Sequence, residues 1–282
     1  MARPNNKYGL SRDIPEPVRR QVRQRCGFGC VLCGCAIIQN HHFDPPFEEA
    51  REHLASGITL LCGRCHDKRT RGMIGDKPIR EADANPFCRR AGVVKDILFE
   101  AAPVRTVRLG CLRFSGQTII QVRDTVLFGF SQSDPGSPLL LNASLPGAEG
   151  KPLLGIVNNE WQTGLDHFDV YTEGPRLFIK ENLGETALEM LYPGNGDLEL
   201  TRLTMQIEGF RIDCRPDAFH LARLAGGSVC FRAPPGAKTT SVIADIGLHI
   251  THDGDCLIAA NRTGGAAVCL AKLRENREQT SP

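Results

Sequence analysis

Two short cysteine motifs near the N-terminus constrain this chain more than any other feature. The first is Cys30-Val-Leu-Cys33, the second is Cys62-Gly-Arg-Cys65, and residues 34–61 separate them. A turn of this kind directs two thiolates toward one tetrahedral ion, and two such turns complete a four-cysteine site. Zinc would also explain how so short a segment folds with little core. The spacing therefore predicts Zn²⁺ bound by Cys30, Cys33, Cys62 and Cys65, with core or redox cysteines as the alternative.

The other cysteines do not suggest a disulfide framework. The chain has 12 cysteines, but it begins MARPNNKYGLSRDIPEP, which lacks the apolar stretch of a secretory signal. We expect a reducing, cytoplasmic environment and, without a long apolar run, no membrane partner. Cys26 and Cys35 lie near the motifs but form no second matched pair. The remaining six are expected to be small buried hydrophobic residues: Cys88, Cys111, Cys214, Cys230, Cys256 and Cys269.

The segments around the motifs predict a compact unit of strand, strand and helix. Asp13 is a candidate N-cap for the first helix, and Pro86 interrupts the last one. In chain order we expect a helix over 15–25, strands over 36–43 and 57–61, a helix over 63–71 and a helical turn over 82–90.

Three histidines accompany the cysteine motifs. His41 and His42 belong to the stretch NHHF after the first motif, and His66 directly follows the second. Two histidines at a strand end and one on the next helix can converge on one point. The stretches RQRCGFGCVLCG, NHH and GITLLCGRCHDKRTRG, in this order, resemble the HNH, or ββα-metal, nuclease family over residues 14–80.

The resemblance implies a metal-dependent endonuclease that hydrolyses DNA phosphodiester bonds. His42 matches the general base, and His41 and His66 match the ligands of a catalytic divalent ion, Mg²⁺ or Mn²⁺. A neutral imidazole can take a proton from water, and the ion can stabilise the departing 3′ oxygen. The zinc would then be structural. Restriction, phage defence or a mobile element would be the setting, by analogy alone.

One position departs from the family pattern. The family has an asparagine five residues before the third cysteine, where this chain has Gly57. In the family that asparagine orients the base histidine, so we expect His42 to be held less firmly here. Asn40 is expected to take over part of this positioning. Replacing Gly57 with asparagine is expected to raise the cleavage rate. The departure leaves open a catalytically degenerate zinc module that binds nucleic acid or a protein partner without cutting. His53 is expected on a helix surface.

Positive charge is concentrated in the first part of the chain. Residues 1–100 contain 17 Lys/Arg and 12 Asp/Glu, whereas the remainder contains 17 and 20. This excess favours DNA as a partner, although a solvated helix face has a similar composition. Lys68, Arg69 and Arg71 follow His66 and are predicted to contact phosphates, with favourable capping of the helix C-terminus as the alternative.

The sequence after residue 103 is β-rich. Apolar and polar residues alternate in stretches such as DLELTRLTMQI, with a phase slip between Leu200 and Leu203, and the turn signals DPGSP, PGAEG, YPGNGD, APPGAK and HDGD separate the stretches. This predicts an antiparallel sandwich, with a solenoid as the alternative. Trp161 is expected in the core, and structural roles are expected for His167, His220, His249 and His252.

The predicted fold class is therefore α+β, with a small zinc-stapled ββα-metal module followed by a β-rich domain. The β-rich part is expected to recognise a target, to bind a partner protein or to form a homo-oligomer, and it could itself be the functional part. We expect a flexible arm over 1–13, the HNH-like module with a helical extension over 14–103, the β-rich domain over 104–274 and a disordered tail over 275–282.

Overall fold

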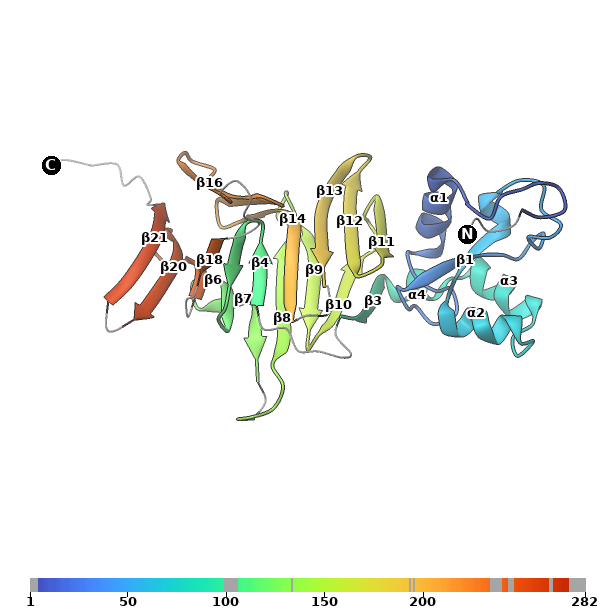
Figure 1. Ribbon diagram of the computed structural model, residues 1–282, viewed down its shortest axis with the longest axis horizontal. Helices are drawn as coiled ribbons and strands as arrows, with labels where there is room; N and C mark the ends of the chain where they lie inside the picture. The colour runs from blue at the N-terminus through green and yellow to red at the C-terminus, as the bar shows by residue number, and fades with distance from the viewer. Residues whose placement is uncertain are drawn as a thin grey trace. The chain divides into compact units, whose positions relative to one another are not determined.

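The protein is α+β, and strands predominate (Figure 1). The computed structural model describes residues 5–98, 106–132, 134–192, 194, 196–233, 240–242, 246–263 and 266–273, so the expected tail lies outside the described residues. Within these ranges, none of the helices has the length and apolar character needed to cross a membrane.

Two compact units make up the chain. The first is Met1–Asp96 with Gln162–Gly174 and Phe178–Glu185, and the second is Ile97–Trp161 with Pro175–Leu177 and Thr186–Pro282. The sequence placed one boundary after residue 103. It did not anticipate that two later segments belong to the first unit.

The first unit is organised around a two-stranded antiparallel sheet. Strands β1 and β2 pair from Ile38↔Cys62 to His42↔Ile58. Every residue of β2 is buried, because helices and loops of the same unit cover it. The elements are α1 (Glu16–Cys26), β1 (Ile38–His42), the 3₁₀ turn η1 (Ala55–Gly57), β2 (Ile58–Cys62), α2 (Gly63–Thr70), α3 (Asp76–Ala84), α4 (Phe87–Ala91), β3 (Val93–Ile97), β11 (Asp169–Glu173) and most of β12 (Arg176–Asn182).

The helix boundaries differ from the expected ones for local reasons. Asp13 is not the N-cap of α1. That position belongs to Pro15, and no side chain caps the helix. Pro17 is tolerated in the first turn because the first amides of a helix have no intrahelical acceptor. The helical turn expected over 82–90 is two helices, since Pro86 cannot continue α3 and instead precedes α4.

The second unit is built from two sheets. One has the order β21-β20-β19-β6-β7-β8-β9, and the other contains β13-β14-β15-β16-β17. Three pairs, β4–β14, β5–β18 and β6–β19, are parallel. The sequence predicted a β-rich domain but not these parallel pairs, because parallel partners need long connections that local turn signals do not reveal.

The strands that lie wholly or largely in this unit are β4 (Thr106–Leu109), β5 (Leu112–Phe114), β6 (Thr118–Val122), β7 (Thr125–Ser131), β8 (Leu140–Pro146), β9 (Pro152–Val157), β13 (Glu185–Leu191), β14 (Asp197–Ile207), β15 (Phe210–Arg215), β16 (Ala218–Arg223), β17 (Ser228–Arg232), β18 (Thr240–Val242), β19 (Ile246–Ile250), β20 (Cys256–Thr263) and β21 (Ala266–Leu273). Strand β10 (Glu160–Gly164) is divided, because its residues from Gln162 onward belong to the first unit.

A β-bulge explains the phase slip in β14. Glu189 pairs with Arg202 and Met190 pairs with Leu200, so Thr201 is an extra residue on β14. A bulge shifts the alternation of side chains by one position, and this keeps the leucines on both sides of it in the core.

The core positions expected from the sequence are confirmed among the described residues, with one exception. Trp161 is buried, as expected. Cys230 is exposed and does not belong to the core. The side chain of Cys269 lies outside the described part, and the other cysteines expected in the core are buried, namely Cys88, Cys111, Cys214 and Cys256.

Candidate metal centre and histidine cavity

The four predicted zinc ligands come together where β2 meets α2. The sulfur atoms of Cys30, Cys33, Cys62 and Cys65 all lie within 4.8 Å of one another. The sulfur of Cys33 is 3.6 Å from that of Cys62 and 3.8 Å from that of Cys65. Sulfurs at about 2.3 Å from one tetrahedral zinc ion are about 3.8 Å apart. The donor set and its spacing therefore fit a divalent metal ion such as zinc.

The two nearby cysteines are not part of this group. The thiol of Cys26 lies 3.9 Å from the hydroxyl of Thr59, in the core. The sulfur of Cys35 lies 3.2 Å from a carboxylate oxygen of Asp96, which also accepts a hydrogen bond from the amide of Ala36. The thiols of Cys26 and Cys35 therefore each contact a polar group of the protein outside the four-cysteine group.

The three predicted catalytic histidines line one cavity of about 300 Å³ in the first unit. His41 and His42 end β1, and His66 lies on α2 directly after Cys65. The rings of His41 and His66 meet edge to face with their centres 5.0 Å apart. Two imidazoles that bind one ion through nitrogens at about 2.1 Å have their centres at a comparable separation, about 5 Å. This pair can therefore share a divalent cation.

Burial keeps both β1 histidines neutral. Burial, followed by the charges of His66 and Arg69, lowers the pKa of His41 to about 4. Burial, followed by His53 and Arg12, lowers the pKa of His42 to about 4. Their imidazoles are therefore unprotonated at neutral pH, which is the form that binds a cation or accepts a proton.

Of the three basic residues predicted to contact phosphates, only Arg69 lines the cavity. It lies three residues after His66 and therefore on the same face of α2, where it also pairs with Asp76. Lys68 and Arg71 are exposed and do not line the cavity, because Lys68 lies on another face of α2 and Arg71 follows the end of the helix.

Arg12 is a cavity residue that the sequence did not single out. Its guanidinium lies 4.2 Å from the ring centre of Phe47, which lines the same cavity. The described part of the expected flexible arm, residues 5–13, is tied to the unit by Asn6, whose side chain donates to the backbone carbonyls of Phe47 at 2.7 Å and Ala50 at 2.6 Å. In the sequence, the run of arginines near the N-terminus was the only signal that pointed to Arg12.

His53 does not lie on a helix surface. It is half-buried in the irregular segment before η1, and its Nδ1 lies 3.1 Å from Nε2 of His42. Its own Nε2 is buried and has no hydrogen-bond partner among the described residues. The expectation failed because the fold of the loop between β1 and β2 decides which residues approach His42.

Gly57 occupies a position that has no room for a side chain. A Cβ atom there would lie 2.1 Å from the carbonyl oxygen of Asp44. The carbonyl of Gly57 accepts hydrogen bonds from the amides of Phe43 at 3.0 Å and Asp44 at 3.3 Å, which hold the two ends of the loop together. An asparagine at position 57 would therefore collide with the backbone of Asp44, and this argues against the expectation that it would improve the site.

Asn40 lines the cavity beside the histidines. Its Oδ1 is buried, and in the described part of the chain it has no hydrogen-bond partner. An amide carbonyl oxygen can bind a hard cation such as Mg²⁺, and it can accept a hydrogen bond from water. Asn40 thus adds an oxygen donor to the two imidazoles.

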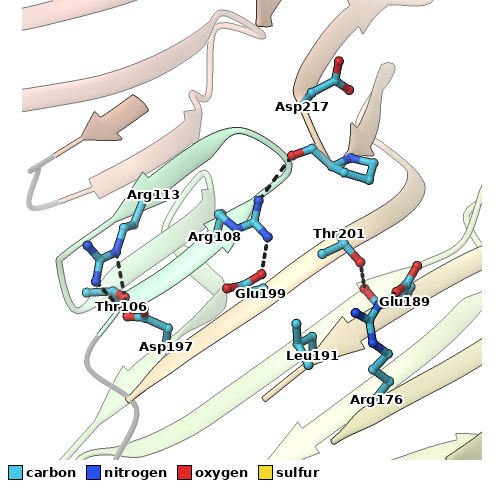
Figure 2. A pocket seen from close by; sticks show the side chains of 11 residues that line it. Thr106, Arg108, Arg113, Arg176, Glu189, Leu191, Asp197, Glu199, Thr201 and Asp217 are labelled. Carbon is cyan, nitrogen blue, oxygen red and sulfur yellow. Dashed lines mark hydrogen bonds and ion pairs between the residues drawn. The ribbon is translucent and has the colours of Figure 1, made fainter. Parts of the chain in front are cut away.

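A larger cavity, of about 690 Å³, lies in the second unit, beside the bulge at Thr201 (Figure 2). Among the described residues that line it there is no aromatic side chain, so it offers no surface on which a base could stack. Its three arginines all have carboxylate partners, in the pairs Arg108–Glu199, Arg113–Asp197 and Arg176–Glu189.

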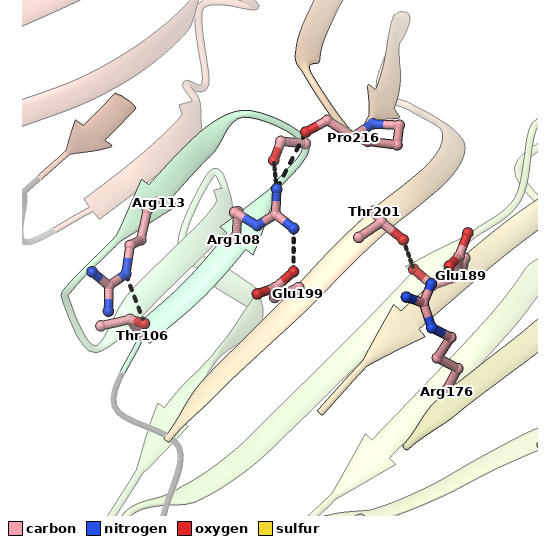
Figure 3. Close-up of polar contacts among 9 residues, drawn as sticks. Thr106, Arg108, Arg113, Arg176, Glu189, Glu199, Thr201 and Pro216 are labelled. Carbon is pink, nitrogen blue, oxygen red and sulfur yellow. Dashed lines mark hydrogen bonds and ion pairs between the residues drawn. The ribbon is translucent and has the colours of Figure 1, made fainter. Parts of the chain in front are cut away.

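The ion pairs of this cavity are anchored by further hydrogen bonds. Arg108 also donates to the backbone carbonyls of Gly110 at 3.1 Å and Pro216 at 3.2 Å (Figure 3). Burial alone would raise the pKa of Asp197, but hydrogen bonds from Thr106 and Arg113 outweigh it and lower that pKa. The charged groups of this cavity therefore pair with one another and link different strands of the unit.

No protein-family model matches this chain, and neither a curated protein nor a solved structure matches it.

Proposed function

We propose that this chain is a metal-dependent endonuclease of the HNH type that hydrolyses DNA phosphodiester bonds. The observation that carries the proposal is the single cavity lined by His41, His42 and His66. The order β1, β2, α2 agrees with the ββα-metal arrangement that the resemblance implies. The four-cysteine group, with zinc as a structural ion, would hold α2 against β2 and thereby His66 near His41.

The cavity residues divide the chemistry between them. His42 takes a proton from water, whose oxygen attacks phosphorus while the bond to the 3′ oxygen breaks. His41 and His66 would hold a divalent ion, Mg²⁺ or Mn²⁺, with Asn40 as a further donor. Such an ion supplies positive charge that stabilises the transition state and the departing oxygen.

Two arginines suit the binding of the DNA backbone. Arg12 and Arg69 line the same cavity from different parts of the chain. Guanidinium groups bind phosphate oxygens strongly, and two of them can position a strand across the histidines. Lys68 and Arg71 remain candidates for phosphates farther along the same strand.

A catalytically degenerate module that binds DNA without cutting is the second candidate. It is favoured by Gly57, since the position where the family has an asparagine cannot hold one here. It would use the same arginines and the same cysteine group.

The test is nicking of supercoiled plasmid DNA in the presence of Mg²⁺ or Mn²⁺. The wild type should nick, and His42→Ala should reduce the rate by about 10²- to 10⁴-fold, the usual contribution of a general base. His252→Ala, an exposed histidine of the second unit, is the matched control and should cut normally. Salt-dependent DNA binding without cleavage would support the second candidate, and absence of both activities would exclude both candidates.

A further inference from the structure

We propose that His53 is a positioning residue that holds His42 in the orientation and tautomer required of a general base. This rests on the endonuclease function proposed above. The contact that carries it is the 3.1 Å approach of His53 Nδ1 to His42 Nε2. The imidazole of His53 thereby supplies the third group that orients a catalytic base.

The groups around His42 restrict the orientation of its ring. The ring of Phe47 packs edge to face against the His42 ring with centres 5.3 Å apart, and the tilted ring of His53 has its centre 5.2 Å away. Position 57 cannot contribute a side chain, because a Cβ there meets the backbone of Asp44. Within the part of the chain that the structure describes, the hydrogen-bond partner of the His42 side chain is His53.

The hydrogen bond between the two rings can form in two ways, and only one supports catalysis. When His42 donates from Nε2–H to Nδ1 of His53, Nδ1 of His42 keeps its lone pair and can accept a proton from water. When His53 donates instead, the proton of neutral His42 is on Nδ1, and that nitrogen cannot act as a base. His53 supports the reaction as an acceptor.

The same bond also stabilises the product of proton transfer. After His42 accepts a proton on Nδ1, its ring is a cation that still donates from Nε2–H to His53. A hydrogen bond from a charged donor is stronger than one from a neutral donor, so the bond strengthens as the reaction proceeds. The role requires an acceptor at the position of His53 Nδ1.

The cleavage assay compares three substitutions in the full chain. His53→Ala removes the acceptor, and kcat should fall about 10- to 100-fold with little change in KM, as for other residues that orient a functional histidine. His53→Asp keeps an acceptor at the same distance from the backbone and should stay within a few-fold of wild type. Glu52→Ala, the exposed neighbour, is the control and should behave as wild type.

A double-mutant cycle separates positioning from general stability. In the His42→Ala background, His53→Ala should cause no further loss of rate, because the residue it orients is absent. All variants should retain zinc. Wild-type activity in His53→Ala, equal impairment of the alanine and aspartate variants, or additive losses in the cycle would overturn the proposal.

A measurement without DNA tests the pair directly. Nitrogen-15 spectra of the histidine side chains, assigned with His42→Ala and His53→Ala, report the tautomer of His42 in the Mg²⁺-bound protein. We expect the Nε2–H form in wild type and in His53→Asp, and a mixture in His53→Ala. His42 protonated on Nδ1 in wild type, or a mixture there, contradicts the proposal even if the variants do not fold. If wild type does not cut DNA, the endonuclease function fails, and the same spectra still decide whether the pair exists.

Discussion

At position 57 a missing side chain allows the loop from β1 to close on the start of β2. We predict that Gly57→Ala lowers the free energy of unfolding by about 1–3 kcal/mol, the usual cost of overpacking, because the new Cβ meets the carbonyl oxygen of Asp44. Thermal unfolding measures this. The control is Gly63→Ala, where the nearest atom is 3.9 Å away and helix propensity should improve. Equal stability of the two variants would show that the loop shifts without cost.

The cysteine group makes a second prediction at the residue scale. Protein purified without chelators should contain about one zinc per chain, and Cys62→Ser should lose it and unfold the N-terminal module while the β-rich strands stay folded. Metal analysis and limited proteolysis measure both effects. Cys230→Ser changes an exposed cysteine outside the group and should keep its zinc. Zinc-free wild-type protein, or a Cys62→Ser variant with full zinc, would contradict this assignment.

At the scale of elements, a buried ion pair joins α1 to β11 within the first unit. The guanidinium of Arg23 donates to both carboxylate oxygens of Asp169, at 2.8 and 2.6 Å, and both side chains are almost fully buried. The Tyr171 ring lies 4.8 Å from the same guanidinium. This contact explains why residues 162–174 belong with the N-terminal helices, although the sequence places them in the β-rich part.

Removing one partner of this pair should therefore be costly. We predict that Asp169→Asn destabilises the first unit by about 3–5 kcal/mol, because it leaves the charge of Arg23 buried without its main counter-ion. Asp67→Asn is the control, since Asp67 pairs with Arg71 on the exposed face of α2 and such pairs contribute about 1 kcal/mol or less. Chemical denaturation should separate the two variants clearly. Arg23 also pairs with Glu16 at 2.5 Å, and similar midpoints would mean that Glu16 is a sufficient counter-ion.

At the scale of the whole molecule, the uneven charge predicts DNA binding that weakens with salt. The logarithm of the binding constant should fall linearly with the logarithm of salt concentration, and Arg69→Ala should reduce the slope by about 1, the value for one lost phosphate contact. Lys151→Ala, in the second unit, should leave the slope unchanged. If Lys68→Ala reduces the slope more than Arg69→Ala, the DNA follows a face of α2 other than the one that lines the cavity.

The sequence by itself determined the features that depend on neighbours along the chain. The spacing of the cysteine motifs predicted the four-cysteine group, and the alternating pattern predicted the β-rich character of the rest. The positions of His41, His42 and His66 around the two motifs predicted that they would line one site. The cysteines do cluster, the β-rich character is confirmed, and the three histidines line one cavity. The sequence could indicate these features because short motifs and alternating patterns are set by residues a few positions apart.

The tertiary structure alone decided the features that depend on contacts between distant segments. It placed His53 against His42, left no room for a side chain at position 57, and chose Arg69 rather than its neighbours to line the cavity. It also paired three strands in parallel and joined residues 162–174 to the N-terminal helices. A local pattern cannot specify these contacts, because they depend on how the loops close and which buried groups satisfy one another once the chain has folded.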